Sequence, residues 1–295
     1  MLRHTFCHIP GVGEKTERRL WEAGLTSWEA VLEREAGRRP AAARRLPVEH
    51  LRDSIRQHAA GDTSWFAQRL PAAQSWRLFR DFREGCAYLD IETTGMAAFD
   101  HVTTIALYDG RTVRHYVHGR NLHDFARDVR AYRLLVTFNG KSFDLPFLER
   151  ALGVRLEQAH IDLRHVLKSL GYSGGLKNCE RQLGLARPGM EDMDGWVAVL
   201  LWREYKRKKD ARALESLLAY NVQDTLNLET LMVEAYNRKL AELEGVPFAA
   251  GYRLPAPAVA RNPFTADPDT VQRVLRANPW FRPFAVEAAQ GSGTV

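Results

Sequence analysis

The chain has 295 residues, of which 45% are apolar, 26% charged and 10% aromatic, a composition typical of a folded protein with one large or two modest domains. The formal net charge is +6, and the excess lies outside the middle of the chain: residues 1–85 carry 15 basic against 11 acidic side chains, residues 86–245 carry 22 of each, and residues 246–295 carry 5 against 3. Three widely spaced cysteines do not favour a disulfide framework or a zinc cluster, and no apolar run reaches the roughly 18 residues of a membrane span, so we expect a cytoplasmic protein. The excess positive charge favours an anionic partner such as nucleic acid.

Residues 1–61 are predicted to form a small helical module. Its expected helices cover residues 14–23, 27–35 and 48–60, with a connecting loop at 38–47 that is rich in Ala, Arg and Pro.

The first of these helices follows the sequence Pro10-Gly11-Val12-Gly13. Glycines let the backbone approach a phosphate, the first amides of the helix point toward it, and Lys15 adds positive charge. Residues 6–24 resemble a helix-hairpin-helix motif, which implies that Gly11, Gly13 and Lys15 contact a nucleic-acid backbone without reading its sequence. The alternative is a helical module that docks to a protein.

Residues 62–85 form a bridging segment that is rich in large aromatic side chains. We expect these to be buried against the next domain. They are Trp65, Phe66, Trp76, Phe79 and Phe82.

Residues 86–245 change from strand to helix patterns along their length. Short β-branched and aromatic runs predict strands at residues 86–92, 102–108, 112–117 and 134–138, the first three forming an antiparallel start, and helical patterns follow at 144–152, 176–183, 195–206 and 212–243. The class is therefore α/β, a mixed sheet flanked by helices. Residues 246–295 are Pro-rich and predict an extended tail with one short helix at 269–277.

Two carboxylates, Asp90 and Glu92, stand two residues apart in the first strand. Side chains alternate between the faces of a strand, so both project from the same face. Because two neighbouring carboxylates are costly to bury without a cation, the pair indicates a site for a hard divalent ion; a solvated strand end is the alternative.

Two further acids lie on predicted helices: Asp144 at the start of one and Asp224 within another. Asp144 follows Asn139 by five residues, and a helix cap would also explain an Asp there. Tyr220 and Asp224 are four residues apart on one helix, so they share a face. A surface Asp and a core Tyr would show the same spacing.

The order D-x-E, N-x₄-D and Y-x₃-D resembles the DEDD exonuclease superfamily in its tyrosine branch, over roughly residues 86–244. Within it, the sequence Gly175-Leu-Lys-Asn-Cys-Glu-Arg-Gln-Leu-Gly looks most like the YprB-like proteins of the ribonuclease H fold. The resemblance implies a ribonuclease H-like sheet, two Mg²⁺ or Mn²⁺ ions and a 3′-to-5′ exonuclease. The ligands that it implies are Asp90, Glu92, Asp144 and Asp224.

The two ions would activate the attacking water and stabilise the leaving oxygen of a phosphodiester. Tyr220 would orient that water, since its ordinary pKa near 10 makes it a poor base at neutral pH. Asn139 and Lys177 are candidates for contact with the substrate, and a solvated lysine is the alternative for Lys177. Asp162 is a candidate secondary site group, with a turn or cap as the preferred role.

We expect nucleic acid as the substrate, with DNA favoured. The alternatives are an RNA-processing exonuclease, a structure-specific endonuclease and a non-catalytic nucleic-acid-binding scaffold of the same fold.

Overall fold

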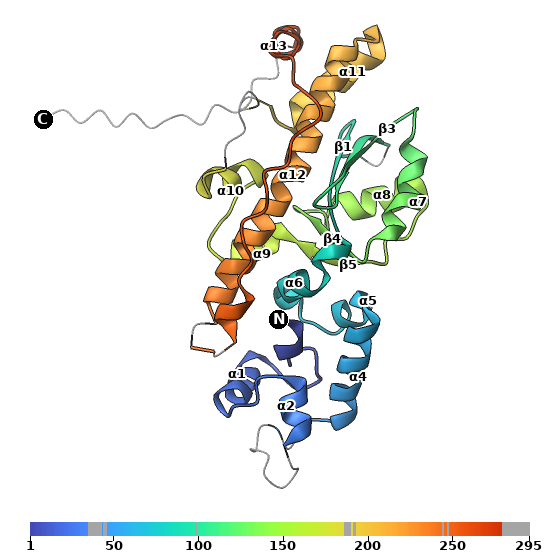
Figure 1. Cartoon of the computed structure of the whole chain (residues 1–295). Helices are drawn as coiled ribbons and strands as arrows, with labels where there is room; N and C mark the ends of the chain where they lie inside the picture. Colours follow the sequence, from blue (N-terminus) through green and yellow to red (C-terminus); the bar gives the residue numbers. More distant parts are fainter. Residues whose placement is uncertain are drawn as a thin grey trace, which may run out of the picture.

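A computed structural model of the chain describes residues 1–278 except 35–42, 44–45, 98, 186–189, 191–192, 244 and 247. Its elements form an elongated molecule with the N-terminal helices at one end, α11 and α13 at the other, and the sheet between them (Figure 1). The strands are β1 Cys86–Thr93, β2 Val102–Tyr108, β3 Val113–Val117, β4 Leu134–Thr137 and β5 Ala159–Asp162. The helices before the sheet are η1 Leu2–His4, α1 Glu14–Glu22, α2 Trp28–Glu33, α4 Val48–Ala60, α5 Thr63–Ala67, η3 Ala72–Arg77, α6 Leu78–Phe82 and η4 Arg83–Gly85. The later helices are η5 Leu122–Asp124, α7 Phe125–Asp128, η6 Val129–Ala131, α8 Asp144–Leu152, α9 Leu163–Ser169, α10 Leu176–Gln182, α11 Gly195–Lys208, α12 Ala211–Ala241, η7 Ala249–Tyr252 and α13 Pro268–Arg276.

The five strands form one mixed sheet in the order β3-β2-β1-β4-β5. β1, β2 and β3 pair antiparallel, whereas β1, β4 and β5 run parallel. The carboxyl ends of β1, β4 and β5 therefore meet at one edge of the sheet, which is where ligands bind in many α/β proteins.

Each face of the sheet is covered by helices. Leu89 and Ile91 of β1 point into a core formed with side chains of α7 and α8. Tyr88 points to the opposite face, into the core that includes α12. Because Asp90 and Glu92 continue the row of Tyr88, alternation directs both toward α12.

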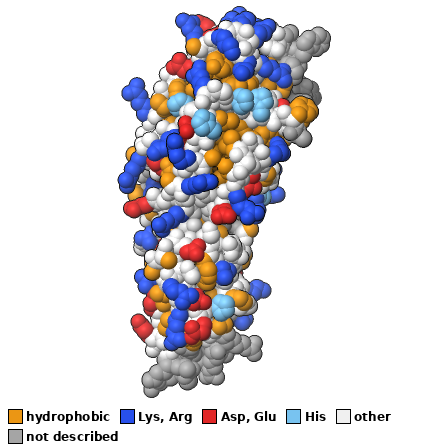
Figure 2. Space-filling view, turned by 90° about the vertical axis from the view of Figure 1, so that its right-hand side faces the viewer, with side chains coloured by type: hydrophobic (Ala, Val, Ile, Leu, Met, Phe, Trp, Pro, Cys, Tyr) orange, Lys and Arg blue, Asp and Glu red, His pale blue; other side chains and the backbone are white. Residues whose placement is uncertain are grey.

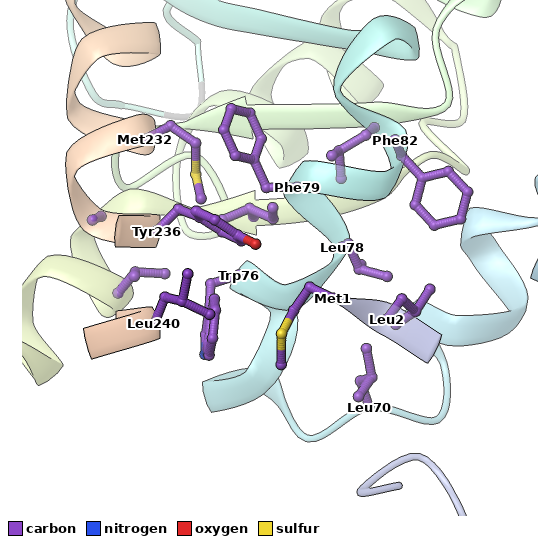
Figure 3. Close-up of a cluster of buried hydrophobic side chains, with 14 of the residues drawn as sticks. Met1, Leu2, Leu70, Trp76, Leu78, Phe79, Phe82, Met232, Tyr236 and Leu240 are labelled. Atoms are coloured by element: carbon purple, nitrogen blue, oxygen red, sulfur yellow. The ribbon is translucent and has the colours of Figure 1, made fainter. Parts of the chain in front are cut away.

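The N-terminal helices are packed onto the rest of the chain through a continuous apolar core. Met1 and Leu2 lie beside the bridging aromatics, which reach Met232, Tyr236 and Leu240 of α12 (Figure 3). Four of the five bridging aromatics expected to be buried have less than a tenth of their surface exposed, and Trp65 is half-buried against the same core.

A buried ion pair adds a polar link to this junction. The Arg77 Nη1 atom lies 2.8 Å from both carboxylate oxygens of Glu17, and both side chains are almost fully buried. Glu17 also accepts the backbone N–H groups of Phe6 and Cys7. Helix α1 is thereby tied to η3 of the bridging segment.

The segment between α12 and α13 runs back along α12 (Figure 1). Three hydrogen-bonded contacts fasten it. Asn237 exchanges two hydrogen bonds with the backbone of Leu254, Asn262 donates to the carbonyl of Ala219, and the N–H of Asp267 donates to the Ser216 hydroxyl. We refer to residues 253–267 as the strap.

The α/β class and the long elements agree with the sequence-based predictions within a few residues. The sequence did not predict α5, α6, α7 and α9, which span four to seven residues each, too short for a helical period to show. The predicted loop at 38–47 lies largely outside the described residues, as do residues 279–295 of the predicted tail. In the described part of the chain, no helix combines the length and hydropathy of a membrane span.

Candidate acidic metal site

Three carboxylates from two elements meet at the carboxyl end of β1. Oxygens of Asp90, Glu92 and Asp224 all lie within 4.8 Å of one another. The two β1 acids share a strand face, and α12 crosses that face with Asp224 directed toward them. Glu92 and Asp224 are more than nine-tenths buried.

Asp144 approaches the same cluster from the next strand connection. It is the first residue of α8, and the preceding Phe143 holds the cap position without a side-chain hydrogen bond, so the helix-cap interpretation of Asp144 is wrong. Its Oδ1 instead accepts the backbone N–H of Ile91 at 3.2 Å, between the two β1 acids. Asp144 lies outside the group of three defined by the 4.8 Å limit.

The turn that leads to Asp144 is built by Asp162 at the end of β5. The Asp162 carboxylate accepts the N–H groups of Asn139, Lys141 and Arg164 at 2.8–3.1 Å. It caps α9, in line with the preferred cap role, and in addition holds the distant turn after β4. Asn139 adopts a positive φ of 66°. Gly140 is required because a Cβ there would lie 2.2 Å from the Thr137 hydroxyl.

The electrostatics of the cluster favour a bound cation. Burial and the charges of Asp224, Asp144 and Glu92 raise the pKa of Asp90 well above its ordinary value. Burial and the charges of Asp224 and Asp144 likewise raise the pKa of Glu92 well above its ordinary value. Burial raises the pKa of Asp144 to about 7. A donor set made only of carboxylate oxygens fits Mg²⁺ or Mn²⁺.

Tyr220 and Lys177 lie beside the acids. Tyr220 is buried on the Asp224 face of α12, and the Lys177 Nζ atom lies 4.9 Å from the centroid of its ring. The charge of Lys177 opposes the rise in the pKa of Glu92. Asn139 accepts a hydrogen bond from Arg164 Nη1 at 2.5 Å through its side-chain oxygen.

Sequence analysis missed one residue at the centre of the cluster. Asn221, fully buried, donates from Nδ2 to Asp90 Oδ2 at 2.7 Å, and its Oδ1 has no hydrogen-bond partner in the structure. The sequence signal that could have identified Asn221 was its position directly after Tyr220 in the Y-x₃-D motif. Asp194 was missed as well: it caps α11, and its charge also raises the pKa of Glu92.

The turn at residues 10–13, which we call the glycine hairpin, lies away from this cluster (Figure 1). Gly11, with φ +80°, and Gly13 are exposed, and Gly13 caps α1. Lys15 is exposed in the first turn of α1. α1 lies at the opposite end of the molecule from α11, beyond the bridging segment (Figure 1).

Comparisons with known proteins give one family and one solved structure. No curated protein matches the chain. A family B DNA polymerase from the hyperthermophilic archaeon Pyrobaculum calidifontis matches with a TM-score of 0.42 and 18% identity, over 58% of this chain and 27% of the polymerase chain, so this chain spans about a quarter of that protein. The family model RNase_H_2, described as RNase_H superfamily, matches residues 87–236, which contain the sheet and all four acids. Because that match covers half of the chain together with a mixed sheet of the expected kind, the chain belongs to the RNase H superfamily.

Proposed function

We propose that the protein is a metal-dependent nuclease, most specifically a 3′-to-5′ exonuclease of the tyrosine-bearing DEDD type that favours DNA. The observation that carries this proposal is the meeting of Asp90, Glu92 and Asp224 within 4.8 Å. Membership of the RNase H superfamily favours a nuclease, and the order of the motifs supports the finer assignment.

Asp90, Glu92, Asp144 and Asp224 would hold two divalent ions. When bound, two such ions would supply Lewis acidity for activating a water and for stabilising the leaving oxygen of a phosphodiester. Asn221 keeps one oxygen of Asp90 fixed through its hydrogen bond. In this proposal Tyr220 orients the attacking water, and the ammonium of Lys177, 4.9 Å from the centroid of the Tyr220 ring, attracts the phosphate.

Residues 86–245 form the nuclease domain in this proposal, and residues 1–61 form a helix-hairpin-helix module that holds the nucleic-acid backbone. Residues 62–85 bridge the two. The exposed amides at Gly13 and the exposed Lys15 support a backbone contact. Residues 246–295 form the C-terminal tail.

The test compares the wild type with Asp224→Asn and with Glu215→Gln, a control that removes an exposed acid from the same helix. Substrates are 5′-labelled single-stranded DNA, duplex DNA with a 3′ overhang, a flap and single-stranded RNA, each with Mg²⁺, Mn²⁺ or EDTA. The proposal predicts a ladder that shortens from the 3′ end, needs metal, is absent in Asp224→Asn and persists in Glu215→Gln.

Other patterns would replace the proposal. A preference for RNA would make the protein an RNA exonuclease, and a single metal-dependent cut at the flap junction would make it an endonuclease. Binding without cleavage under every metal condition would leave a scaffold of the same fold.

A further inference from the structure

Two cavities adjoin where the bridging segment meets the edge strand β5, and at their junction the Ser64 hydroxyl donates to the carbonyl of Glu157 at 2.8 Å. One cavity of about 650 Å³ lies between residues 60–64 and the segments that precede β4 and β5. A second, of about 630 Å³, follows β5 and α9. The two cavities share Ser64, Glu157 and Gln158, so we treat them as one feature, the β5 groove.

One end of the β5 groove is basic. Arg130, Arg133 and Arg155 line it together with Tyr132. Arg130 and Arg155 are exposed, and among the described residues no carboxylate forms an ion pair with either of them. Guanidinium groups suit two-point contact with phosphate oxygens, so this end offers two unneutralised sites for a phosphate.

The acidic side chains of the groove are mostly occupied by the protein itself. Asp62 accepts the N–H of Trp65 at 2.9 Å as the cap of α5. Asp162 accepts three backbone N–H groups in the turn after β4. Glu157 is the third acid and lies where the two cavities join. The arginine end therefore carries three arginines against two carboxylates, those of Asp62 and Glu157, and remains net positive.

The other end of the groove leads toward the acidic cluster. Lys141 lines it, three residues before Asp144. Midway, Gln158 donates from Nε2 to the carbonyl of Val129 and so fixes the chain before β5 to the segment that precedes β4. Between the arginine end and the turn at Asn139 lies β4, whose four residues span about 13 Å.

We propose that the β5 groove binds the sugar-phosphate backbone of the strand whose end lies at the acidic cluster, with Arg130, Arg133 and Arg155 holding phosphates several nucleotides away. The inference goes further than the proposed nuclease function and rests on it. It assigns these arginines to the substrate itself. Strands that are too short to reach them gain nothing from the groove.

The experiment measures binding without metal and cleavage with it. Arg130→Gln/Arg155→Gln removes two of the three exposed arginines and leaves Arg133, which donates to the Gly61 carbonyl. Arg111→Gln/Arg253→Gln removes the same charge from exposed arginines outside the groove. Fluorescence anisotropy in EDTA measures the affinity for a labelled 20-nucleotide single strand over a range of salt concentrations. Cleavage in Mg²⁺ compares the KM for strands of 4 and 20 nucleotides.

The groove variant is expected to bind the 20-nucleotide strand roughly ten- to thirtyfold more weakly at 0.1 M salt, with a log–log salt slope smaller by about 1.4, since each phosphate contact contributes about 0.7. Its KM for the long strand rises similarly, while the KM for the 4-nucleotide strand and both kcat values stay at the wild-type level. The control pair should retain wild-type affinity within a fewfold change.

Equal affinity in the wild type and the groove variant, or an equal loss of affinity in the control pair, would overturn the proposal that the β5 groove binds the substrate strand. The nuclease proposal would stay intact. A wild type that neither binds nor cleaves any strand would overturn both.

Discussion

Asn221 links the two chain segments that build the acidic cluster, because it lies on α12 and donates to Asp90 of β1. Its carboxamide is fully buried beside carboxylates whose pKa values are raised. A donor in this place fixes the orientation of one oxygen of Asp90, which a metal ion would need. Outer hydrogen bonds of this type commonly contribute 10- to 100-fold to metal affinity.

We therefore predict that Asn221→Leu weakens the binding of Mn²⁺ by about tenfold or more. The substitution keeps the branched shape of the side chain, with a larger volume, but removes the hydrogen bond. Titration of the protein with Mn²⁺, followed by electron paramagnetic resonance, measures the affinity without nucleic acid. Asn227→Leu, six residues further along α12 and hydrogen-bonded to Glu180, is the matched control. Unchanged Mn²⁺ affinity in Asn221→Leu, with its thermal unfolding also unchanged, would show that Asn221 does not position Asp90.

At the residue scale, local rules identified the acids but not their supports. Strand alternation alone places Asp90 and Glu92 on one face of the first strand, and helix spacing places Tyr220 and Asp224 on one face of the long helix. The hydrogen bonds of Asn221 to Asp90 and of Asp162 to Asn139 join residues 131 and 23 positions apart. Such pairings depend on the tertiary fold, so no local pattern in one sequence predicts them.

At the scale of elements, the strap and α13 hold the outer side of α12 and the end of α11. Val271 and Val274 are buried in a core with residues of α11 and α12. Arg273 contacts Glu204 of α11 and, at 2.5 Å, Asp210. Although burial opposes it, hydrogen bonds from Lys208, Arg207 and Arg273 lower the pKa of Glu204 to about 2. The Pro-rich composition predicted an extended segment but gave no sign of this packing.

Val274→Asp is expected to release α13, because an unpaired carboxylate would have to be buried in an apolar core. The cost is on the order of 2 kcal/mol or more. Hydrogen exchange of α13 amides, followed by mass spectrometry, would report the release as faster exchange. Gln272→Asp places the same charge on an exposed position of α13 and should leave the exchange unchanged. If Val274→Asp retained wild-type protection, the packing of α13 would not depend on this apolar contact.

At the scale of the whole molecule, the ion pair of Glu17 and Arg77 joins the N-terminal module to the bridging segment. Arg77→Met leaves the Glu17 carboxylate buried without its partner, so we expect a loss of about 3–5 kcal/mol in the free energy of unfolding. Glu17→Gln/Arg77→Met should lose less than Arg77→Met, because no unpaired charge remains. Urea unfolding of the single and double variants measures both values. A double variant as unstable as Arg77→Met would mean that the packing of the Arg77 side chain, and not its charge, stabilises the junction.

The N-terminal module also makes stability depend on pH. Burial, with smaller effects from nearby His50, Arg69 and Arg77, lowers the pKa of His8 to about 3, and its Nε2 lies 2.6 Å from the Ser54 hydroxyl. The unfolded chain, with an ordinary pKa near 6.5, then binds a proton that the folded state excludes, so stability falls as the pH drops from about 6.5 toward 3. Between pH 7.5 and 4.5 this amounts to about 3 kcal/mol. His8→Gln should lose less stability over that interval in urea titrations. An identical loss in His8→Gln would place the acid sensitivity elsewhere.

The glycine hairpin lies far from the acidic cluster, so it can change binding without changing chemistry. Gly13 has open space around its Cα and a φ that other residues adopt, so Gly13→Val folds normally while its side chain blocks the approach of a backbone to the α1 amides. We predict that Gly13→Val/Lys15→Gln binds a long duplex several-fold more weakly, with a salt slope smaller by about 0.9 for the lost lysine contact. Its kcat on a 4-nucleotide strand should equal that of the wild type, since such a strand cannot reach α1 from the acids. Arg111→Gln, which removes one exposed charge elsewhere, controls for net charge. Unchanged duplex affinity in the hairpin variant would instead favour a module that docks to a protein. A nucleic-acid contact at the hairpin requires that both the affinity and its salt dependence change when Gly13 and Lys15 are replaced.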